Sequence, residues 1–291
     1  MKFLKFFAFL PLCLSLYSCG KPSPKVIEND DYTFFQDHSY GEHERHLFDL
    51  YLPKNPTKRH GLILNIHGGG WVAGDKESFG DSLPAQVRKY GLAAAAIDYR
   101  YVNGKDIIWS DLLDDITASL NAIKSLAAEH DFNLTTMSLT GGSAGAHLSL
   151  LYAYRVADKA PIRPVSVVSL SGPTDFNDPN YFPLGDEIVK MCEKVTGVSM
   201  LDGITPEEKE ALRGPSPVDY VTANTVPTLL AHSTVDTIIP YSNAETLKQK
   251  LDECGVKNDL VVFPTGGHGL SPDPEALEEL NAKTPDYIAM L

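Results

Sequence analysis

Short apolar runs alternate with amphipathic segments along most of this chain, and this alternation constrains its fold more than any other feature. Residues 110–130 repeat leucine and isoleucine at spacings of three and four, as the buried face of a helix requires. Residues 61–67 and 92–99 are nearly continuous apolar runs, which are typical of strands buried on both faces. Strands that alternate with helices in this way predict an α/β fold, a mostly parallel sheet with helices on both faces.

The expected elements follow from these patterns. Strands are expected at 46–53, 61–67, 92–99, 135–142, 165–172, 225–233 and 258–264, and helices at 82–91, 110–130, 143–157 and 241–255. The first strand alternates apolar and polar residues, which predicts a half-exposed antiparallel strand. Residues 173–224 are polar and contain prolines, with short helical pieces, so we expect a cap over the carboxyl edge of the sheet. Residues 32–291 are therefore expected to form one domain.

The first 18 residues are typical of an export signal. Lys2 and Lys5 precede an apolar run over 6–16 that is too short to span a membrane, and Cys19 follows directly. The ending "LYSC" resembles a bacterial lipobox, in which the cysteine carries the lipid. We therefore expect an exported bacterial lipoprotein on the periplasmic or cell-surface face, with 19–31 as a polar tether. An ordinary cleaved signal, with Cys19 uninvolved, is the alternative.

Charge and cysteine content exclude some classes of partner. The chain has a formal net charge of −13, and loss of the signal would remove two more lysines. Nucleic acid is therefore excluded as a partner, because phosphate binding needs clustered Lys and Arg. In an exported domain Cys192 and Cys254 could form a disulfide or remain as two free thiols, and both alternatives stay open.

Three residues with the chemistry of a nucleophilic enzyme follow predicted strands. Ser143 lies in "GGSAG", Asp236 follows "LLAHSTV", and His268 follows "VVFPTGG". The carboxyl ends of parallel strands lie on one edge of a sheet, where sites form. A serine hydroxyl needs a base to take its proton, and that base needs a carboxylate to fix its tautomer. This spacing predicts a nucleophile, an acid and a base at one site.

Each assignment has an alternative. Ser143 could be a helix N-cap, since serine is favoured there. Asp175, which follows another strand, is the rival acid, although "HSTVDTIIP" fits an acid loop better. His147, one helical turn beyond Ser143, is expected to be buried and structural. The sequence contains no H-E-x-x-H motif and no phosphate-binding glycine loop, so no metal and no cofactor are expected.

The chain resembles the α/β-hydrolases in the order Ser143, Asp236, His268 and in the motifs "GGSAGAH" and "HGGGW". It is most similar to carboxylesterases related to hormone-sensitive lipase and to the bacterial feruloyl/acetylxylan esterase group. The resemblance implies an oxyanion hole made by the N–H groups of Gly69, Gly70 and Ala144. It places Trp71 against the acyl pocket, although a simply packed indole is equally compatible with the motif.

The resemblance implies a serine esterase that hydrolyses short-chain acyl esters, acetyl esters on carbohydrates in particular. The expected partners are thus a small acyl ester or an acylated glycan, and the membrane through the lipid anchor. Kynurenine formamidases carry the same "HGGxW" signature, so an amide hydrolase is the first alternative. A non-catalytic surface binding protein on a hydrolase scaffold is the second.

Overall fold

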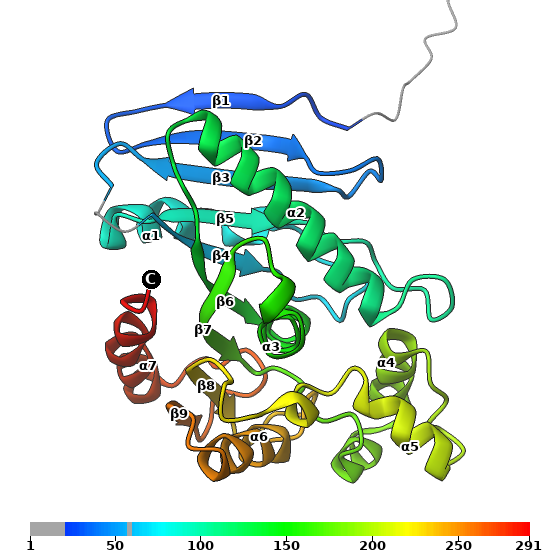
Figure 1. Cartoon of the computed structure of the whole chain (residues 1–291). Helices are drawn as coiled ribbons and strands as arrows, with labels where there is room; N and C mark the ends of the chain where they lie inside the picture. The colour runs from blue at the N-terminus through cyan, green and yellow to red at the C-terminus, as the bar shows by residue number, and fades with distance from the viewer. Residues whose placement is uncertain (1–20, 57–59) are drawn as a thin grey trace, which may run out of the picture.

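The computed structural model describes residues 21–56 and 60–291, which are built around a nine-stranded sheet (Figure 1). Its strands are β1 (Lys25–Glu28), β2 (Tyr32–Ser39), β3 (Leu47–Pro53), β4 (Gly61–Ile66), β5 (Ala93–Ile97), β6 (Thr136–Gly142), β7 (Arg163–Leu170), β8 (Thr228–Ser233) and β9 (Asn258–Phe263). They lie in the order β1-β2-β3-β5-β4-β6-β7-β8-β9. Strands β1 to β3 run antiparallel to their neighbours, and the six strands β4 to β9 pair with one another in parallel. The predicted mostly parallel sheet is confirmed.

Helices cover both faces of this sheet. They are α1 (Ser82–Tyr90), α2 (Trp109–Glu129), α3 (Ala144–Arg155), α4 (Asp186–Thr196), α5 (Pro206–Arg213), α6 (Ser242–Glu253) and α7 (Pro274–Ile288). Strand β5 shows why both faces must be covered, since alternate side chains point to opposite sides. Ala94 and Ala96 pack in one buried cluster with Leu83 and Val87 of α1, whereas Ile97 belongs to the cluster that contains α2 and α3.

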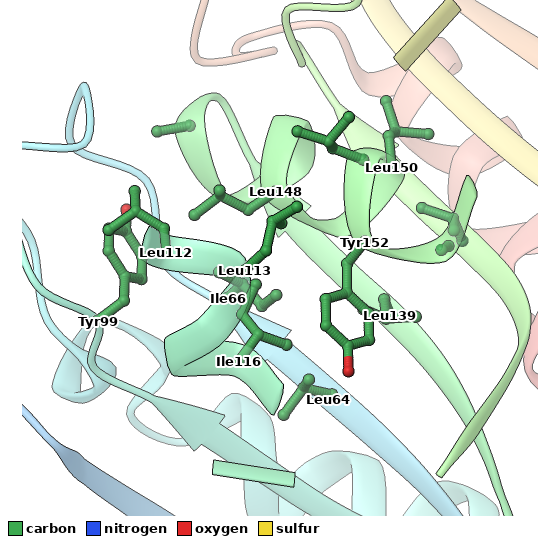
Figure 2. Close-up of a cluster of buried hydrophobic side chains, with 14 of the residues drawn as sticks. Leu64, Ile66, Tyr99, Leu112, Leu113, Ile116, Leu139, Leu148, Leu150 and Tyr152 are labelled. Atoms are coloured by element: carbon green, nitrogen blue, oxygen red, sulfur yellow. The ribbon is translucent and has the colours of Figure 1, made fainter. Parts of the chain in front are cut away.

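The largest buried cluster lies between the sheet, α2 and α3 (Figure 2). Side chains from the three elements interlock there, and those drawn and labelled include Leu64, Ile66, Leu112, Leu113, Ile116, Leu139, Leu148, Leu150 and Tyr152. Burying side chains of this size stabilises a fold by roughly 1.5–3 kcal/mol each. Helix α3, which follows the serine, is therefore anchored in the core.

Strand β3 differs from the prediction. It is antiparallel, as expected, but all its residues are buried, so it is not half-exposed. It lies inside the sheet between β2 and β5, and both α1 and α2 pack on it. Asp49, the polar residue of the alternating pattern, is held by the buried ammonium of Lys76, 3.1 Å away. Asp49 made β3 look half-exposed in the sequence, but its ion pair with Lys76 allows it to be buried.

The segment expected to be a tether contains a strand. Residues 25–28 form β1, which pairs with β2, so the sheet begins before residue 32. All four β1 residues are exposed, which explains why no apolar pattern predicted the strand. The signal segment and Cys19 lie outside the described residues. In the described part of the chain, no helix has the length and apolar character needed to span a membrane.

The insertion between β7 and β8 folds as the predicted helical cap. It contains the short helices η3 (Pro179–Leu184) and η4 (Pro217–Tyr220) as well as α4 and α5. Helix α4 reaches the loop after β4, because a methyl group added at Gly70 would lie 3.1 Å from the sulfur of Met191. The cap therefore lies beside the carboxyl edge of the sheet (Figure 1).

Candidate active site

Ser143 occupies a strained turn between β6 and α3. Its φ of 54° and ψ of −121° are unfavourable for a residue with a side chain, at a cost of about 1–3 kcal/mol. A methyl group added at Gly145 would lie 1.9 Å from Ile66 O, so the turn tolerates no side chain there. The Ser143 side chain makes no capping hydrogen bond to α3. The N-cap alternative therefore fails, and the geometry is that of a nucleophile elbow.

The loop of residues 67–74, called the oxyanion loop below, lies next to Ser143. A methyl group added at Gly68 would lie 3.6 Å from Ser143 Cβ. Gly69 and Gly70 have φ values of 106° and 57°, which glycine adopts freely. Within the described residues, their N–H groups donate to no backbone acceptor. Ala144 is the first residue of α3, so its N–H also has no partner inside the helix.

Trp71, in the middle of this loop, packs into the core. Its side chain is only 1% exposed, and its indole N–H donates to Nδ1 of His147 over 3.1 Å. His147 in turn donates from Nε2 to Pro215 O over 2.8 Å. Burial lowers the pKa of His147 to about 4, although the bond to Pro215 acts in the opposite direction. His147 is therefore the buried structural residue that was expected, and Trp71 is a packed indole whose role at a pocket stays a prediction.

Asp236 and His268 meet on the same edge of the sheet. His268 Nδ1 lies 2.8 Å from Asp236 Oδ2, and the imidazole remains 22% exposed. Burial acts to raise the pKa of Asp236, but the hydrogen bonds from His232, His268 and two backbone amides outweigh it and hold that pKa well below its usual range. The carboxylate is thus ionised and aims the imidazole.

His232 is a residue at this site that the sequence did not single out. Its ring is buried at the end of β8, with Nε2 3.2 Å from Asp236 Oδ2 and 3.0 Å from Ile239 O. Both of these partners are acceptors, so Nε2 carries the proton. Asp236 Oδ2 therefore receives two imidazole N–H groups. The only sequence signal was a histidine four residues before the candidate acid.

The rival acid, Asp175, points elsewhere. Its N–H donates to Asn243 Oδ1, and its carboxylate accepts from the N–H of Asn177 over 2.8 Å. Burial raises the pKa of Asp175. In the described part of the chain, the carboxylate that His268 contacts is that of Asp236.

Backbone contacts bring Ser143 and His268 to the same place. The N–H of Ser143 donates to Leu170 O at the end of β7, over 2.8 Å. The next residue, Ser171, donates from its hydroxyl to His268 O over 3.0 Å. The loops that carry the serine and the histidine therefore share one anchor point.

A surface hollow lies between the oxyanion loop and the cap. Apolar and charged side chains of both signs surround it, and its lining consists of Val72, Gly104, Glu187, Lys190, Met191, Glu193 and Lys194. Carboxylates, ammonium groups and backbone atoms can all hydrogen-bond to hydroxyl groups. The hollow is thus suited to a polar molecule.

Beyond the candidate triad, the residues of chemical interest are the two cysteines of the domain and the side chains that could bind a metal ion. Cys192 and Cys254 are free thiols, and burial raises the pKa of Cys192 to about 12. Among residues 21–56 and 60–291, no three His, Cys, Asp or Glu side chains come together as metal ligands would.

Comparisons with known proteins identify the family of this chain. The family model BD-FAE matches residues 48–251, a segment that contains Ser143 and Asp236 and ends before His268. The "Probable isoprenylcysteine alpha-carbonyl methylesterase ICMEL1" of Arabidopsis thaliana is 26% identical over 263 residues, covering 84% of this chain and 54% of that protein. The "Probable carboxylic ester hydrolase LipM" of Mycobacterium tuberculosis is 28% identical over 251 residues, covering 80% of this chain and 54% of that protein. This chain thus spans about half the length of these relatives.

A solved structure extends the comparison to the whole fold. A truncated carbohydrate esterase from gut microbiota superposes with a TM-score of 0.70 at 22% identity, over 91% of this chain and 99% of that chain. Together with the strand order, this similarity confirms the predicted α/β-hydrolase fold.

Proposed function

The chain belongs to the BD-FAE family, and on this basis we propose that it is a serine esterase for short-chain acyl esters, acetyl esters of carbohydrates in particular. The observation that carries the proposal is the 2.8 Å hydrogen bond between His268 Nδ1 and the buried Asp236 carboxylate. It lies on the edge of the sheet at which Ser143 occupies its strained turn. A fixed imidazole, an ionised partner and a half-buried serine at one site are the parts that acyl transfer requires.

The reaction follows from these parts. With the Nδ1 proton bound to Asp236, His268 keeps an unprotonated Nε2 and takes the proton of Ser143 as its oxygen attacks the ester carbonyl. The tetrahedral intermediate collapses when His268 gives that proton to the leaving alcohol. Water, activated by the same imidazole, then attacks the acyl-enzyme and releases the carboxylic acid. Asp236 stays ionised and stabilises the imidazolium in both steps.

The negative oxygen that forms in each step needs donors already in place. We assign this role to the N–H groups of Gly69, Gly70 and Ala144. Removing one such donor typically lowers kcat about 10²- to 10³-fold. Such donors lower the barrier because they bind the charge that develops in the transition state.

The polar hollow beside α4 supports a carbohydrate as the alcohol half of the ester. Its two glutamates and two lysines can hydrogen-bond to the hydroxyl groups of a sugar. The carbohydrate esterase named above is consistent with this choice. A small, hydrophilic ester is therefore the substrate we propose.

The proposed location rests on the sequence. A positively charged start, an apolar run and "LYSC" favour export and lipidation at Cys19. Labelled palmitate should enter the wild-type protein in a bacterial host, and Cys19→Ser should abolish incorporation. If both proteins stay unlabelled, Cys19 is not an anchor.

The reaction is tested by acetate release from acetylated xylo-oligosaccharides, with p-nitrophenyl acetate as a reference ester. We expect release from both, and Ser143→Ala should lower kcat by about 10⁶-fold. Activity on the reference ester alone would keep the mechanism and reject the glycan. Faster turnover of N-formylkynurenine would favour the amide-hydrolase alternative, and no reaction with a fluorophosphonate would favour a binding protein.

A further inference from the structure

We propose that Arg45 is a positioning residue that holds the oxyanion loop in the shape that aims the N–H of Gly69 at the reacting carbonyl. The inference rests on the proposed function, because it concerns the oxyanion hole of that reaction. Arg45 lies between β2 and β3, far from Ser143 in the sequence and outside the segment that matches the family model.

Arg45 connects the segment that follows β5, at Tyr99, to the last residue of the oxyanion loop, Gly74. Its Nε donates to Tyr99 O over 2.7 Å, and Nη2 donates to Gly74 O over 2.9 Å. Its guanidinium carbon lies 3.8 Å from the centre of the Tyr101 ring, and the Tyr101 hydroxyl also donates to Gly74 O. The side chain is 17% exposed. A planar fork with several fixed donors suits such a multiple contact.

The same guanidinium determines which nitrogen of His67 carries the proton. Nη2 of Arg45 lies 3.2 Å from His67 Nε2, and because arginine can only donate, Nε2 must accept. The proton is then on Nδ1, which donates to Gly68 O over 2.7 Å. Burial and the charge of Arg45 lower the pKa of His67 to about 4, against the effect of the bond to Gly68, so the ring is neutral at neutral pH.

The bond from His67 orients the next peptide group. A trans peptide is planar, with its C=O and N–H pointing in opposite directions. With Gly68 O held by His67, the N–H of Gly69 must point away from that ring. Gly68 is also the loop residue that approaches Ser143 Cβ. The chain of contacts from Arg45 therefore ends at the Gly68–Gly69 peptide, next to the loop residue that approaches Ser143.

Without Arg45, two features would allow the Gly68–Gly69 peptide to change its orientation. Asp98 Oδ1 lies 3.8 Å from His67 Nε2, so a proton on Nε2 would gain a carboxylate acceptor and Nδ1 would lose its donor role. Gly69 and Gly70 have no side chains to oppose rotation of the peptide. Among the described residues, the side chain that would still donate to Gly68 O is Tyr99, whose hydroxyl lies 3.5 Å away and 2.9 Å from His67 O.

The first experiment compares Arg45→Met and Arg45→Lys with the wild-type protein on p-nitrophenyl acetate. We expect kcat to fall about 10²-fold in Arg45→Met with KM within threefold, because the loss of one oriented donor affects the transition state more than substrate binding. Lysine, which presents one rotatable charge, should restore less than tenfold.

Arg100→Met is the matched control. Arg100 is 23% exposed, and its Nη2 lies 2.8 Å from Asp115, so it resembles Arg45 in burial and pairing. Within residues 21–56 and 60–291, its side chain bonds to Asp115 and Asp111 and not to the oxyanion loop. We expect a similar fall in Tm and a kcat within threefold of wild type. If Arg45→Met lowers kcat no more than Arg100→Met does, the inference is wrong.

Two substitutions at His67 separate its two nitrogens. Asparagine keeps an N–H donor at the position of Nδ1, whereas glutamine keeps an acceptor at the position of Nε2 and removes the donor to Gly68. We expect His67→Asn to retain at least tenfold more kcat than His67→Gln, and the reverse order would overturn the inference. Ring ¹⁵N shifts give an independent check, since the proton should leave Nδ1 of His67 in Arg45→Met and remain in Arg100→Met.

Failure of the inference and failure of the proposed function give different results. Should Ser143→Ala keep full activity, the proposed function fails whatever Arg45 does. With Ser143→Ala inactive and Arg45→Met equal to Arg100→Met, only the inference fails. Loss of activity in both Ser143→Ala and Arg45→Met, with Arg100→Met active, supports both.

Discussion

Two loops meet at Ser143, and they are held in place in very different ways. The oxyanion loop is fixed by side chains from distant parts of the chain: Arg45 bonds to its two ends at His67 and Gly74, and His147 bonds to Trp71 in its middle. The loop of residues 264–272, called the histidine loop below, depends mainly on its own backbone. Two bonds close it internally, from Leu270 and Ser271 to the glycines before His268, and open space surrounds others of its glycines.

This difference follows from what each loop contributes. A peptide N–H points wherever its backbone points, so an oxyanion hole is only as exact as the loop that carries it. An imidazole can be aimed by one carboxylate, and the bond from Asp236 to His268 provides this. The histidine loop can therefore make few contacts with the rest of the protein, provided that Asp236 itself is firmly fixed.

The substitution with the largest expected effect tests whether Asp236 alone orients His268 in a loop that makes few other contacts. Asp236→Asn should lower kcat about 10⁴-fold, because an amide in this position favours the wrong tautomer of His268. Steady-state kinetics at neutral pH would measure the loss. A fall of less than tenfold would mean that other contacts orient His268.

A pair of glycine substitutions compares the two loops directly. A methyl group at Gly69 would lie 2.1 Å from Ala73 O, in a backbone with φ of 106°, whereas nothing lies within 4 Å of one at Gly269. Gly69→Ala should therefore lower kcat about 10²- to 10³-fold, and Gly269→Ala should change it by roughly threefold or less. Comparable losses in the two variants would contradict the proposed difference in rigidity.

The second imidazole on Asp236 should have a smaller effect. His232→Ala removes a hydrogen bond to a charged group, which is worth about 1.5–3 kcal/mol, so we expect kcat to fall about tenfold. Glutamine can place an N–H near the position of Nε2, and His232→Gln should recover most of the loss. Equal activity of alanine and glutamine variants would show that the bond to Asp236 is not what matters.

The smallest expected effect is on the pH dependence of stability near the oxyanion loop. The pKa of His147 is about 4 in the fold and about 6.5 when unfolded, so the unfolded chain binds the proton more tightly. The contribution of neutral, buried His147 to the free energy of unfolding is complete above pH 6.5 and is lost as the pH falls toward 4. The stability gap between wild type and His147→Gln, from urea unfolding, should narrow over that range. A constant gap would mean that His147 does not titrate on unfolding.

Much of the fold and of the catalytic set was predictable because the signals are local. Apolar periodicity reports buried strands and helices, and Ser143, Asp236 and His268 each follow such a strand. Strand β1 is fully exposed and leaves no apolar pattern, and α7 contains Pro285, which weakens a helical signal. These two elements were missed for that reason, and β2 (Tyr32–Ser39) was also missed, although its residues alternate between buried and half-buried positions.

The supporting residues at the site could not be predicted in the same way. Arg45 and His232 matter through partners distant in the sequence or through a shared carboxylate oxygen, and no spacing pattern records such contacts. Burial of β3 was hidden because Asp49 is neutralised by Lys76. Sequence patterns therefore indicate the candidate reactive residues more readily than the residues that position them.

The wide separation of Arg45, Ser143 and His268 along the chain has a consequence for the timing of activity. A growing chain that has reached residue 251 contains the serine, the acid and the whole cap, yet it lacks the base. Strand β9 must also join the sheet before the histidine loop can lie beside Ser171. Under the proposed function, synthesis and folding therefore have to pass residue 268 before an ester can be cleaved, so a shorter nascent chain is expected to be inactive.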